Sequence, residues 1–183
     1  MQAVSIQMPE ATESPKTIQE LFEEHHQVVL QAAFRITGNV DDAEDVLQTV
    51  FIRLLRRSDL PDLGKGARAY LHRAAINAAL DVVRSRKSTN AVSIDLVGPL
   101  PGSHPSGRPD QLSSSKELGR WLREAIARLR PKSAEMFVLR FIEGYSNQQI
   151  ADLLGTSTGT IAVTLHRTRA RLQEEASSFL GGN

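Results

Sequence analysis

A proline- and glycine-rich stretch near the middle of the chain constrains the fold more than any other feature. Residues 89–113 contain four prolines and three glycines, namely Pro99, Pro101, Pro105, Pro109, Gly98, Gly102 and Gly107. Proline removes a backbone donor and glycine is entropically costly to order, so such a stretch cannot sustain a helix or an interior strand. The sequence therefore predicts a flexible tether between two compact blocks.

The first block has the pattern of three helices. Thr17 and Glu20 form a capping box, and apolar residues then recur at helical spacing until Gly38. A second helix is expected to open at Asn39, and a third to run from about 67 to 87 after a loop at 58–66. No segment here alternates in the manner of a strand.

The second block predicts four more helices. The first is expected to open with a capping box at Ser114 and Glu117, and Pro131 suits the first position of the next helix. Ser146 is placed to cap a short helix, and the hydroxyl cluster 156–158 to cap a last one that ends near 175. The predicted fold class is all-α: two small helical domains joined by a flexible linker, with boundaries at 17–88, 89–113 and 114–178.

Composition and charge exclude some kinds of functional site and indicate the kinds of partner. The chain has 183 residues, a net charge of +1 and no cysteine, which excludes disulfides, thiolate zinc sites and cysteine nucleophiles. Residues 17–62 hold nine acids against four arginines, whereas residues 66–88 hold five bases against one acid. An acidic face followed by a basic one suggests two different partners, the second of them polyanionic.

No apolar run approaches the ~20 residues that span a bilayer. Residues 1–16 are polar and lack the apolar core of a signal peptide. We expect them to be a disordered leader on a cytoplasmic protein.

The most specific local pattern is a helix-turn-helix at residues 146–172. Ala151 is small where the two helices would cross, Gly155 permits the tight turn, and Ile161 and Leu165 would lock the second helix onto the first. The opposite face of that second helix would then be free to enter a DNA groove. An ordinary two-helix corner with a solvated basic face is the alternative interpretation of this segment.

Three segments in order resemble a known family. Residues 144–161 and 165–172 are similar to region 4 of the extracytoplasmic-function sigma factors of RNA polymerase. Residues 42–54 resemble the region 2 helix that those proteins press against the polymerase clamp, and residues 67–81 resemble their promoter-opening helix. The matches lie on both sides of the predicted linker.

The resemblance implies a role for each segment. The expected core-polymerase contacts are Asp42, Asp45, Gln48 and Phe51. The expected contacts to the melted minus-ten strand are Tyr70, Arg73, Asn77 and Arg84, with a flipped base held by the loop at 58–66. The expected minus-thirty-five contacts are Thr158, Thr160, Ala162, Val163, His166, Arg167, Arg169 and Arg171. Core polymerase, promoter DNA and an anti-sigma factor are the expected partners, with no cofactor and no metal.

The sequence departs from the family pattern at three places. Ala162, Val163 and Thr164 stand where the family usually carries lysine and arginine. Ile76 replaces a common arginine, and Leu55 a common tryptophan. The second helix of the helix-turn-helix is therefore expected to contact DNA through apolar contacts to thymine methyl groups and through His166 and Arg167.

Three other classes of protein are alternatives to a sigma factor. An enzyme is disfavoured because the five histidines lack metal-ligand spacing and no nucleophile is paired with a base. A conventional helix-turn-helix regulator accounts for the second block, but not for a clamp-like helix and a basic helix together in the first. A purely structural adaptor leaves the arginines of the last helix unexplained.

Overall fold

The computed structural model describes residues 17–56, 66–89 and 109–181, and these residues form helices and short connections without a strand. The helices are α1 (Ile18–Thr37), α2 (Val40–Leu55), α3 (Ala67–Thr89), α4 (Pro109–Ala127), α5 (Pro131–Phe141), α6 (Asn147–Leu154) and α7 (Thr158–Gly181). The all-α prediction is confirmed. The expected leader, the base-capturing loop (apart from Gly66) and most of the linker lie outside the described residues.

Local signals set the ends of α1 and α2. The Thr17 hydroxyl accepts a hydrogen bond from the Glu20 amide at 3.2 Å, and the Glu20 carboxylate accepts one from the Thr17 amide at 2.7 Å. Gly38 ends α1 at φ +68°, in the left-handed region that suits glycine. The Asn39 side chain then caps α2 by accepting from the Asp42 amide at 3.1 Å.

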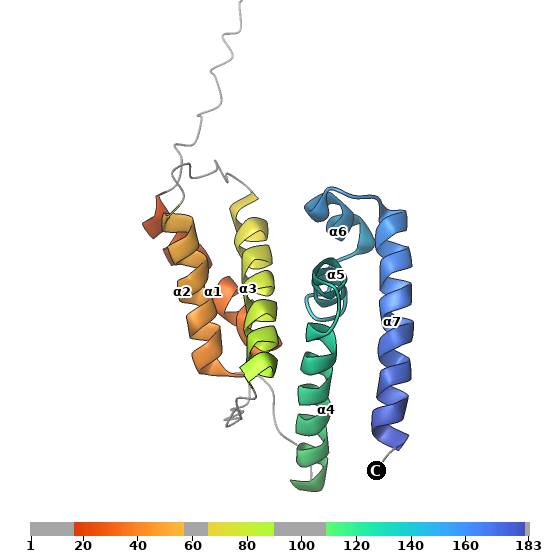
Figure 1. The fold of residues 1–183 in the computed structure, drawn as a ribbon. Coiled ribbons are helices and arrows are strands. Elements are labelled where there is room, and N and C mark those ends of the chain that lie inside the picture. Colours follow the sequence, from red (N-terminus) through yellow and green to blue (C-terminus); the bar gives the residue numbers. More distant parts are fainter. Residues whose placement is uncertain (1–16, 57–65, 90–108, 182–183) are drawn as a thin grey trace, which may run out of the picture.

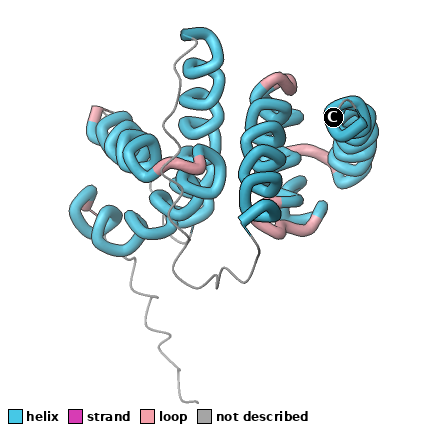
Figure 2. Tube along the Cα trace, turned by 90° about the horizontal axis from the view of Figure 1, so that it is seen from below, coloured by secondary structure: helices cyan, strands magenta, loops and turns pink. Residues whose placement is uncertain are grey.

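Helix α3 is the central element of the molecule. It packs against α1 and α2 on one side and against α4 and α5 on the other (Figure 1). Its residues Leu71, Ile76 and Leu80 are at most 1% exposed. The N-terminal block (α1–α3) and the C-terminal block (α4–α7) contribute to one apolar cluster, so the two blocks pack together (Figure 2).

The C-terminal block differs from the prediction at its first helix. Helix α4 begins at Pro109, so the capping box expected at Ser114 and Glu117 is wrong and both residues lie inside the helix. Proline is favoured in the first turn, where its missing N–H is not needed, and this allows the last residues of the expected linker to become helical. Pro131 does open α5 as predicted. Helix α7 continues to Gly181, beyond the expected end near residue 175.

Candidate nucleic-acid interface

Helices α6 and α7 form the predicted helix-turn-helix. Ser146 and Gln149 make a reciprocal capping box at the start of α6, with hydrogen bonds of 3.2 and 2.8 Å. Gly155 adopts φ +62° at the turn, and the Thr156 amide donates to the carbonyl of Ala151 at 3.0 Å. The turn is therefore fixed by hydrogen bonds that these residues supply themselves.

The second helix of the motif is anchored through one face. Ser157 caps α7 by accepting from the Thr160 amide at 3.1 Å. Ile161 and Leu165 are 0% and 6% exposed, and Ile150 and Ala151 of α6 are equally buried. These side chains fix the orientation of α7 on α6, as the spacing predicts.

The other face of α7 is exposed along its length. All eight residues expected to contact the minus-thirty-five element are exposed: Thr158, Thr160, Ala162, Val163, His166, Arg167, Arg169 and Arg171. Val163 is the most apolar of them and is 51% exposed. The structure thus leaves all eight residues accessible on a single helix, around the part of its surface that does not pack on α6.

One of the arginines also takes part in an ion-pair network. Arg171 donates to the Glu175 carboxylate at 2.9 Å, and Arg128, directly after the end of α4, donates to it at 2.7 Å. The hydrogen bonds from Arg128 and Arg171 lower the pKa of Glu175. Arg171 is therefore held near α4 at the point where α7 leaves the exposed motif.

The four expected polymerase contacts all lie on α2 and fall into two pairs that differ in exposure. Asp45 and Gln48 are exposed, whereas Asp42 and Phe51 are 7% and 6% exposed. The helical spacing of apolar residues places both Leu54 and Leu55 on the buried stripe of α2, but only Leu54 is buried, at 2% exposed, whereas Leu55 is 60% exposed. Ile52 is 43% exposed.

Asp42 faces α3 rather than solvent. Its Oδ1 accepts a hydrogen bond from Arg86, while its Oδ2 has no hydrogen-bond partner within the described part of the chain. Burial raises the pKa of Asp42 despite the opposing effect of the Arg86 charge. Phe51 packs edge-on against Phe22 of α1 with ring centroids 5.0 Å apart. Asp42 and Phe51 therefore connect α2 to its neighbours.

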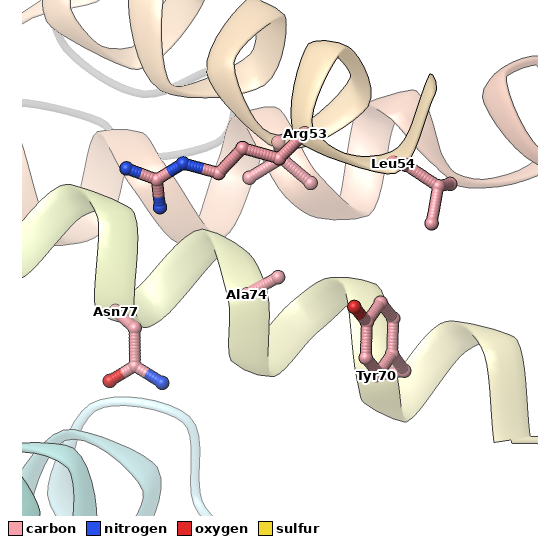
Figure 3. Close-up of a pocket in the computed structure, with 6 residues that line it drawn as sticks. Arg53, Leu54, Tyr70, Ala74 and Asn77 are labelled. Atoms are coloured by element: carbon pink, nitrogen blue, oxygen red, sulfur yellow. The ribbon is translucent and has the colours of Figure 1, made fainter. Parts of the chain in front are cut away.

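The four residues expected to contact the minus-ten strand all lie on α3 and are half-buried. Tyr70 and Asn77 line a pocket between α2 and α3, together with Val50, Arg53, Leu54 and Ala74 (Figure 3). In that view Asn77 points away from Arg53 and toward the C-terminal block. The aromatic ring and the amide thus leave α3 in different directions.

Three of these four residues bind the C-terminal block. The Glu135 carboxylate of α5 accepts from Arg73 Nε at 2.6 Å and from Asn77 Nδ2 at 2.9 Å. Arg84 Nε donates to the carbonyl of Ala127 at 3.3 Å. The structure therefore brings Arg73, Asn77 and Arg84 to the interface between the two blocks.

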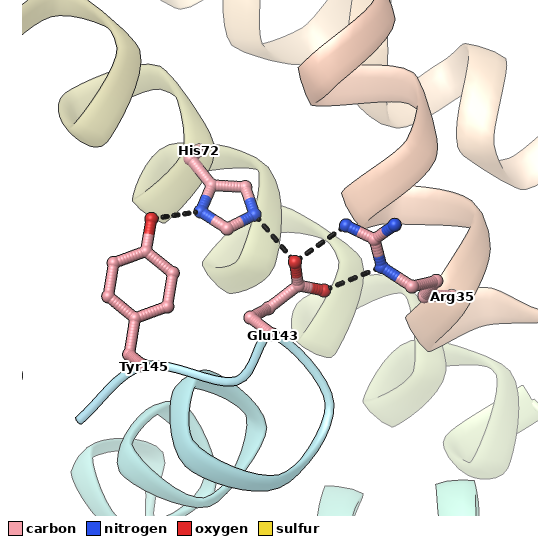
Figure 4. A network of polar contacts seen from close by, with 4 residues as sticks. All are labelled: Arg35, His72, Glu143 and Tyr145. Atoms are coloured by element: carbon pink, nitrogen blue, oxygen red, sulfur yellow. Dashed lines mark hydrogen bonds and ion pairs between the residues drawn. The ribbon is translucent and has the colours of Figure 1, made fainter.

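A second carboxylate at this interface was not anticipated from the sequence. Glu143 accepts two hydrogen bonds from Arg35, at 2.8 and 2.6 Å, and contacts His72 Nε2 at 2.9 Å (Figure 4). The other ring nitrogen of His72 lies 3.0 Å from the Tyr145 hydroxyl. Since Arg35 and Glu143 are 108 positions apart, no local pattern could have paired them.

The charge state of Glu143 follows from these contacts. Burial raises the pKa of its carboxyl, but the hydrogen bonds and charges of His72 and Arg35 more than offset this, so the pKa lies below its ordinary value of 4.5. An ionised carboxylate only accepts hydrogen bonds, so His72 Nε2 donates to it, and in the neutral ring Nδ1 accepts from Tyr145.

The described ranges, 17–56, 66–89 and 109–181, contain neither grouped metal ligands nor a helix that could span a membrane. Within them, no three His, Asp or Glu side chains are grouped so as to hold a metal ion. None of the helices there is both long and apolar enough to cross a membrane.

Comparison with known proteins agrees with the geometry. Residues 21–89 match the family "Sigma-70 region 2", and residues 119–172 match "Sigma-70, region 4". The first match covers most of α1–α3, and the second contains α5, α6 and the helix-turn-helix.

Curated relatives cover most of the chain. It is 33% identical to the RNA polymerase sigma-E factor of Streptomyces avermitilis, over 82% of this chain and 79% of the relative. It is 28% identical to the ECF RNA polymerase sigma factor SigW of Bacillus subtilis, over 80% and 82%. Identity to SigE of Mycolicibacterium smegmatis is 34% over 85% of this chain, which spans only 60% of that longer relative.

A solved structure shares the fold. CnrH, determined in complex with the cytosolic domain of CnrY, superposes with a TM-score of 0.51 at 22% identity, over 92% of each chain. The relatives do not favour the conventional helix-turn-helix regulator considered from the sequence. Two matching regions in order, on a fold of two helical blocks, lead to one conclusion: the chain belongs to the extracytoplasmic-function group of the sigma-70 family of RNA polymerase sigma factors.

Proposed function

We propose that this protein directs core RNA polymerase to specific promoters and helps to open them, as a cytoplasmic factor without catalytic activity of its own. Residues 17–88 would bind core polymerase and the minus-ten element, residues 114–178 would bind the minus-thirty-five element, and residues 89–113 would connect them. The observation that carries this proposal is the helix-turn-helix whose buried face is locked on α6 and whose opposite face on α7 is exposed.

Promoter duplex recognition is assigned to the exposed face of α7. Ala162 and Val163 offer apolar contact to thymine methyl groups, and His166 and Arg167 offer hydrogen bonds to base edges or phosphates. Arg169 and Arg171 lie further along and suit phosphate contacts, which position the helix without specifying sequence. A good bidentate contact to a base is worth about 1–3 kcal/mol of discrimination.

Polymerase binding is assigned to the exposed face of α2. Asp45 and Gln48 supply polar groups, and the exposed Ile52 and Leu55 supply apolar surface beside them. Interfaces of this kind combine an apolar centre with a polar rim. Asp42 and Phe51 would contribute indirectly, by holding α2 against α3 and α1.

Strand binding is assigned to α3. Tyr70 can stack on an unpaired base, and Arg73, Asn77 and Arg84 can bind the backbone or base edges. The flipped base would be held by the loop at 58–66.

An anti-sigma factor is the expected regulator. CnrH, which shares this fold, was solved with the cytosolic domain of CnrY. We extend to this chain the idea that a partner protein covers its polymerase-binding faces.

The test is a pull-down and run-off transcription assay with purified bacterial core RNA polymerase on a library of promoter fragments. We expect stable core binding and promoter-specific transcripts only when the protein is present. Duplex DNA binding by the protein alone, without core binding, would overturn the proposal in favour of a conventional regulator.

Variants separate the two faces in the same assay. The double substitution D45K/Q48K is expected to abolish core binding, because it reverses the charge of the α2 face. H166A/R167A is expected to keep core binding and lose promoter selectivity. Q173A, exposed on α7 beyond the motif, is the matched control and should behave as the unmodified protein.

A further inference from the structure

Two arginines from separate segments bind the same carboxylate beside the helix-turn-helix. One oxygen of Glu175 accepts from Arg171 Nε at 2.9 Å, and the other accepts from Arg128 Nη2 at 2.7 Å. Arg128 and Glu175 are 47 positions apart in the sequence. We refer to Arg128 and Arg171 as the arginine pair.

The arginine pair carries more positive charge than Glu175 neutralises. Hydrogen bonds from Arg128 and Arg171 lower the pKa of Glu175, so one ionised carboxylate faces two guanidinium ions at neutral pH. Two such ions repel each other unless an anion lies between them, and Glu175 is that anion. Because exposed ion pairs contribute little to stability, the stability of the fold does not explain why two arginines meet here.

Both guanidinium groups can bind a further anion. The side chains of Arg128 and Arg171 are 33% and 57% exposed. A guanidinium has five N–H donors, and within the described part of the chain these two groups donate only to Glu175. The planar fork of arginine donors matches the oxygens of a phosphate group. The arginine pair therefore suits a phosphate that contacts both side chains.

The arginine pair lies at the far end of the exposed face of α7. Val163, Arg167 and Arg171 follow one another at intervals of four residues, so they lie along one side of the helix. At about 1.5 Å per residue, Arg171 stands about 12 Å along the helix from Val163. Helix-turn-helix proteins contact base edges through the first residues of the second helix. Arg171 is thus placed beyond the bases, where phosphates border a groove about 12 Å wide.

The surroundings of the arginine pair suit a polyanion. Residues 153–173 hold three arginines and no acid, and residues 128–132 hold three bases and no acid. Arg130 and Lys132 of the second segment are exposed. Since Glu175 joins Arg128 to Arg171, the positive surface continues from α7 to the start of α5.

We propose that Arg128 and Arg171 together bind a backbone phosphate of the promoter duplex beside the minus-thirty-five element. The inference rests on the proposed function, which places α7 in the DNA groove. Glu175 sets the spacing of the two guanidinium groups, and the phosphate binds the donors that Glu175 leaves open. Arg128 is then a duplex contact that lies outside the helix-turn-helix. Such a contact strengthens binding to all sequences alike, because a phosphate does not report the identity of the base.

The test measures how the affinity of the full-length protein for duplex DNA depends on salt. Two short fluorescein-labelled duplexes of unrelated sequence are titrated with the protein alone at several sodium chloride concentrations, and fluorescence anisotropy gives the affinity. Each phosphate contact adds about 0.9 to the slope of the logarithm of affinity against the logarithm of salt concentration. We expect R128Q to reduce that slope by roughly one and to weaken binding to both duplexes by the same factor.

The substitution R120Q is the charge-matched control. Arg120 is exposed earlier on α4, and its replacement removes the same charge from the same block. R120Q should leave the slope as in the unmodified protein. An unchanged slope in R128Q, or an equal loss of slope in R120Q, would overturn the phosphate site.

A double-substitution cycle tests whether the two arginines share one phosphate. Residues that bind the same group have non-additive effects, so R128Q/R171Q should weaken binding by less than the product of the two single factors. If the factors multiply, the arginines act at separate phosphates and the shared site is wrong.

The variant R128K serves if R128Q loses its helical circular dichroism. Lysine keeps the charge but lacks the planar fork, so the salt slope should stay while the affinity falls at every salt concentration. Affinity equal to that of the unmodified protein would overturn binding through the paired guanidinium groups.

The two proposals fail differently. Absence of core-dependent transcription by the unmodified protein overturns the proposed function, whatever the salt slopes show. An unchanged salt slope in R128Q overturns the phosphate site, whatever the transcription assay shows, because the titrations contain no polymerase.

Discussion

Single residues in this protein act either by capping local structure or by bridging distant parts of the chain. Ser146 belongs to the first kind, since it satisfies backbone donors three positions away. Glu143 belongs to the second, since its partners Arg35 and His72 are 108 and 71 positions distant. The two kinds of residue call for different measurements.

Substitution of Ser146 tests the cap. S146A removes the acceptor for the Gln149 amide at the start of α6, and loss of such a cap costs about 1 kcal/mol. Urea unfolding should show a decrease of that size in the free energy of unfolding. S177A, which removes an exposed hydroxyl that donates to the carbonyl of Gln173 in its own helix, should change it by less than about 0.5 kcal/mol. Equal effects of the two substitutions would contradict the role of the cap.

Acid titration tests Glu143. Because its pKa in the folded protein is lowered below the ordinary 4.5, its contribution to stability is complete above that value and is lost as the pH falls through the lowered folded pKa. The free energy of unfolding should therefore exceed that of E143Q at neutral pH, and the difference should shrink below about pH 4.5. Urea titrations of both proteins between neutral and acidic pH measure this. A difference that stays constant down to the acid limit would show that Glu143 does not titrate as the contacts require.

At the scale of elements, α7 combines a structural face and a recognition face. Ile161 is fully buried against α6, while Val163, two positions later, is 51% exposed. The same helix therefore offers a matched pair of apolar positions with opposite surroundings.

Truncation of those two side chains separates stability from recognition. I161A should lower the free energy of unfolding by about 2–5 kcal/mol, as large-to-small substitutions in a core do. V163A should change stability by less than about 0.5 kcal/mol and lower selectivity for the minus-thirty-five element in run-off transcription. If V163A matched the unmodified protein in transcription, the apolar contact assigned to this position would be wrong.

The element boundaries show where sequence reasoning holds and where it ends. Caps at Thr17, Asn39 and Ser146 were predictable because capping is decided within four residues. The start of α4 was not, because Pro109 serves equally well in a tether or in a first helical turn. The exposure of Leu55 on α2 was also missed, since periodicity does not reveal where a neighbouring helix stops covering a stripe.

At the scale of the whole molecule, the two blocks share an apolar cluster and two buried carboxylates. Such coupling makes the blocks unfold together, whereas tethered but separate blocks unfold independently.

Calorimetry tests this coupling. We expect one cooperative transition for the unmodified protein, with equal calorimetric and van't Hoff enthalpies. E135Q/E143Q should broaden or split the transition, because the blocks then lose their shared polar contacts. Two separate transitions in the unmodified protein would show that the packing between the blocks is not cooperative.

The sequence by itself determined the features that depend on residues within a few helical turns of one another: the all-α class, the helix-turn-helix, the caps and the family. Only the tertiary structure decided that Asp42 is turned inward to Arg86, and that Arg73 and Asn77 meet Glu135. The physical reason is the separation along the sequence over which each interaction acts. Periodicity and capping act over a few residues, whereas the partner of a buried charge is chosen by how whole helices pack, across separations of 44 to 108 positions.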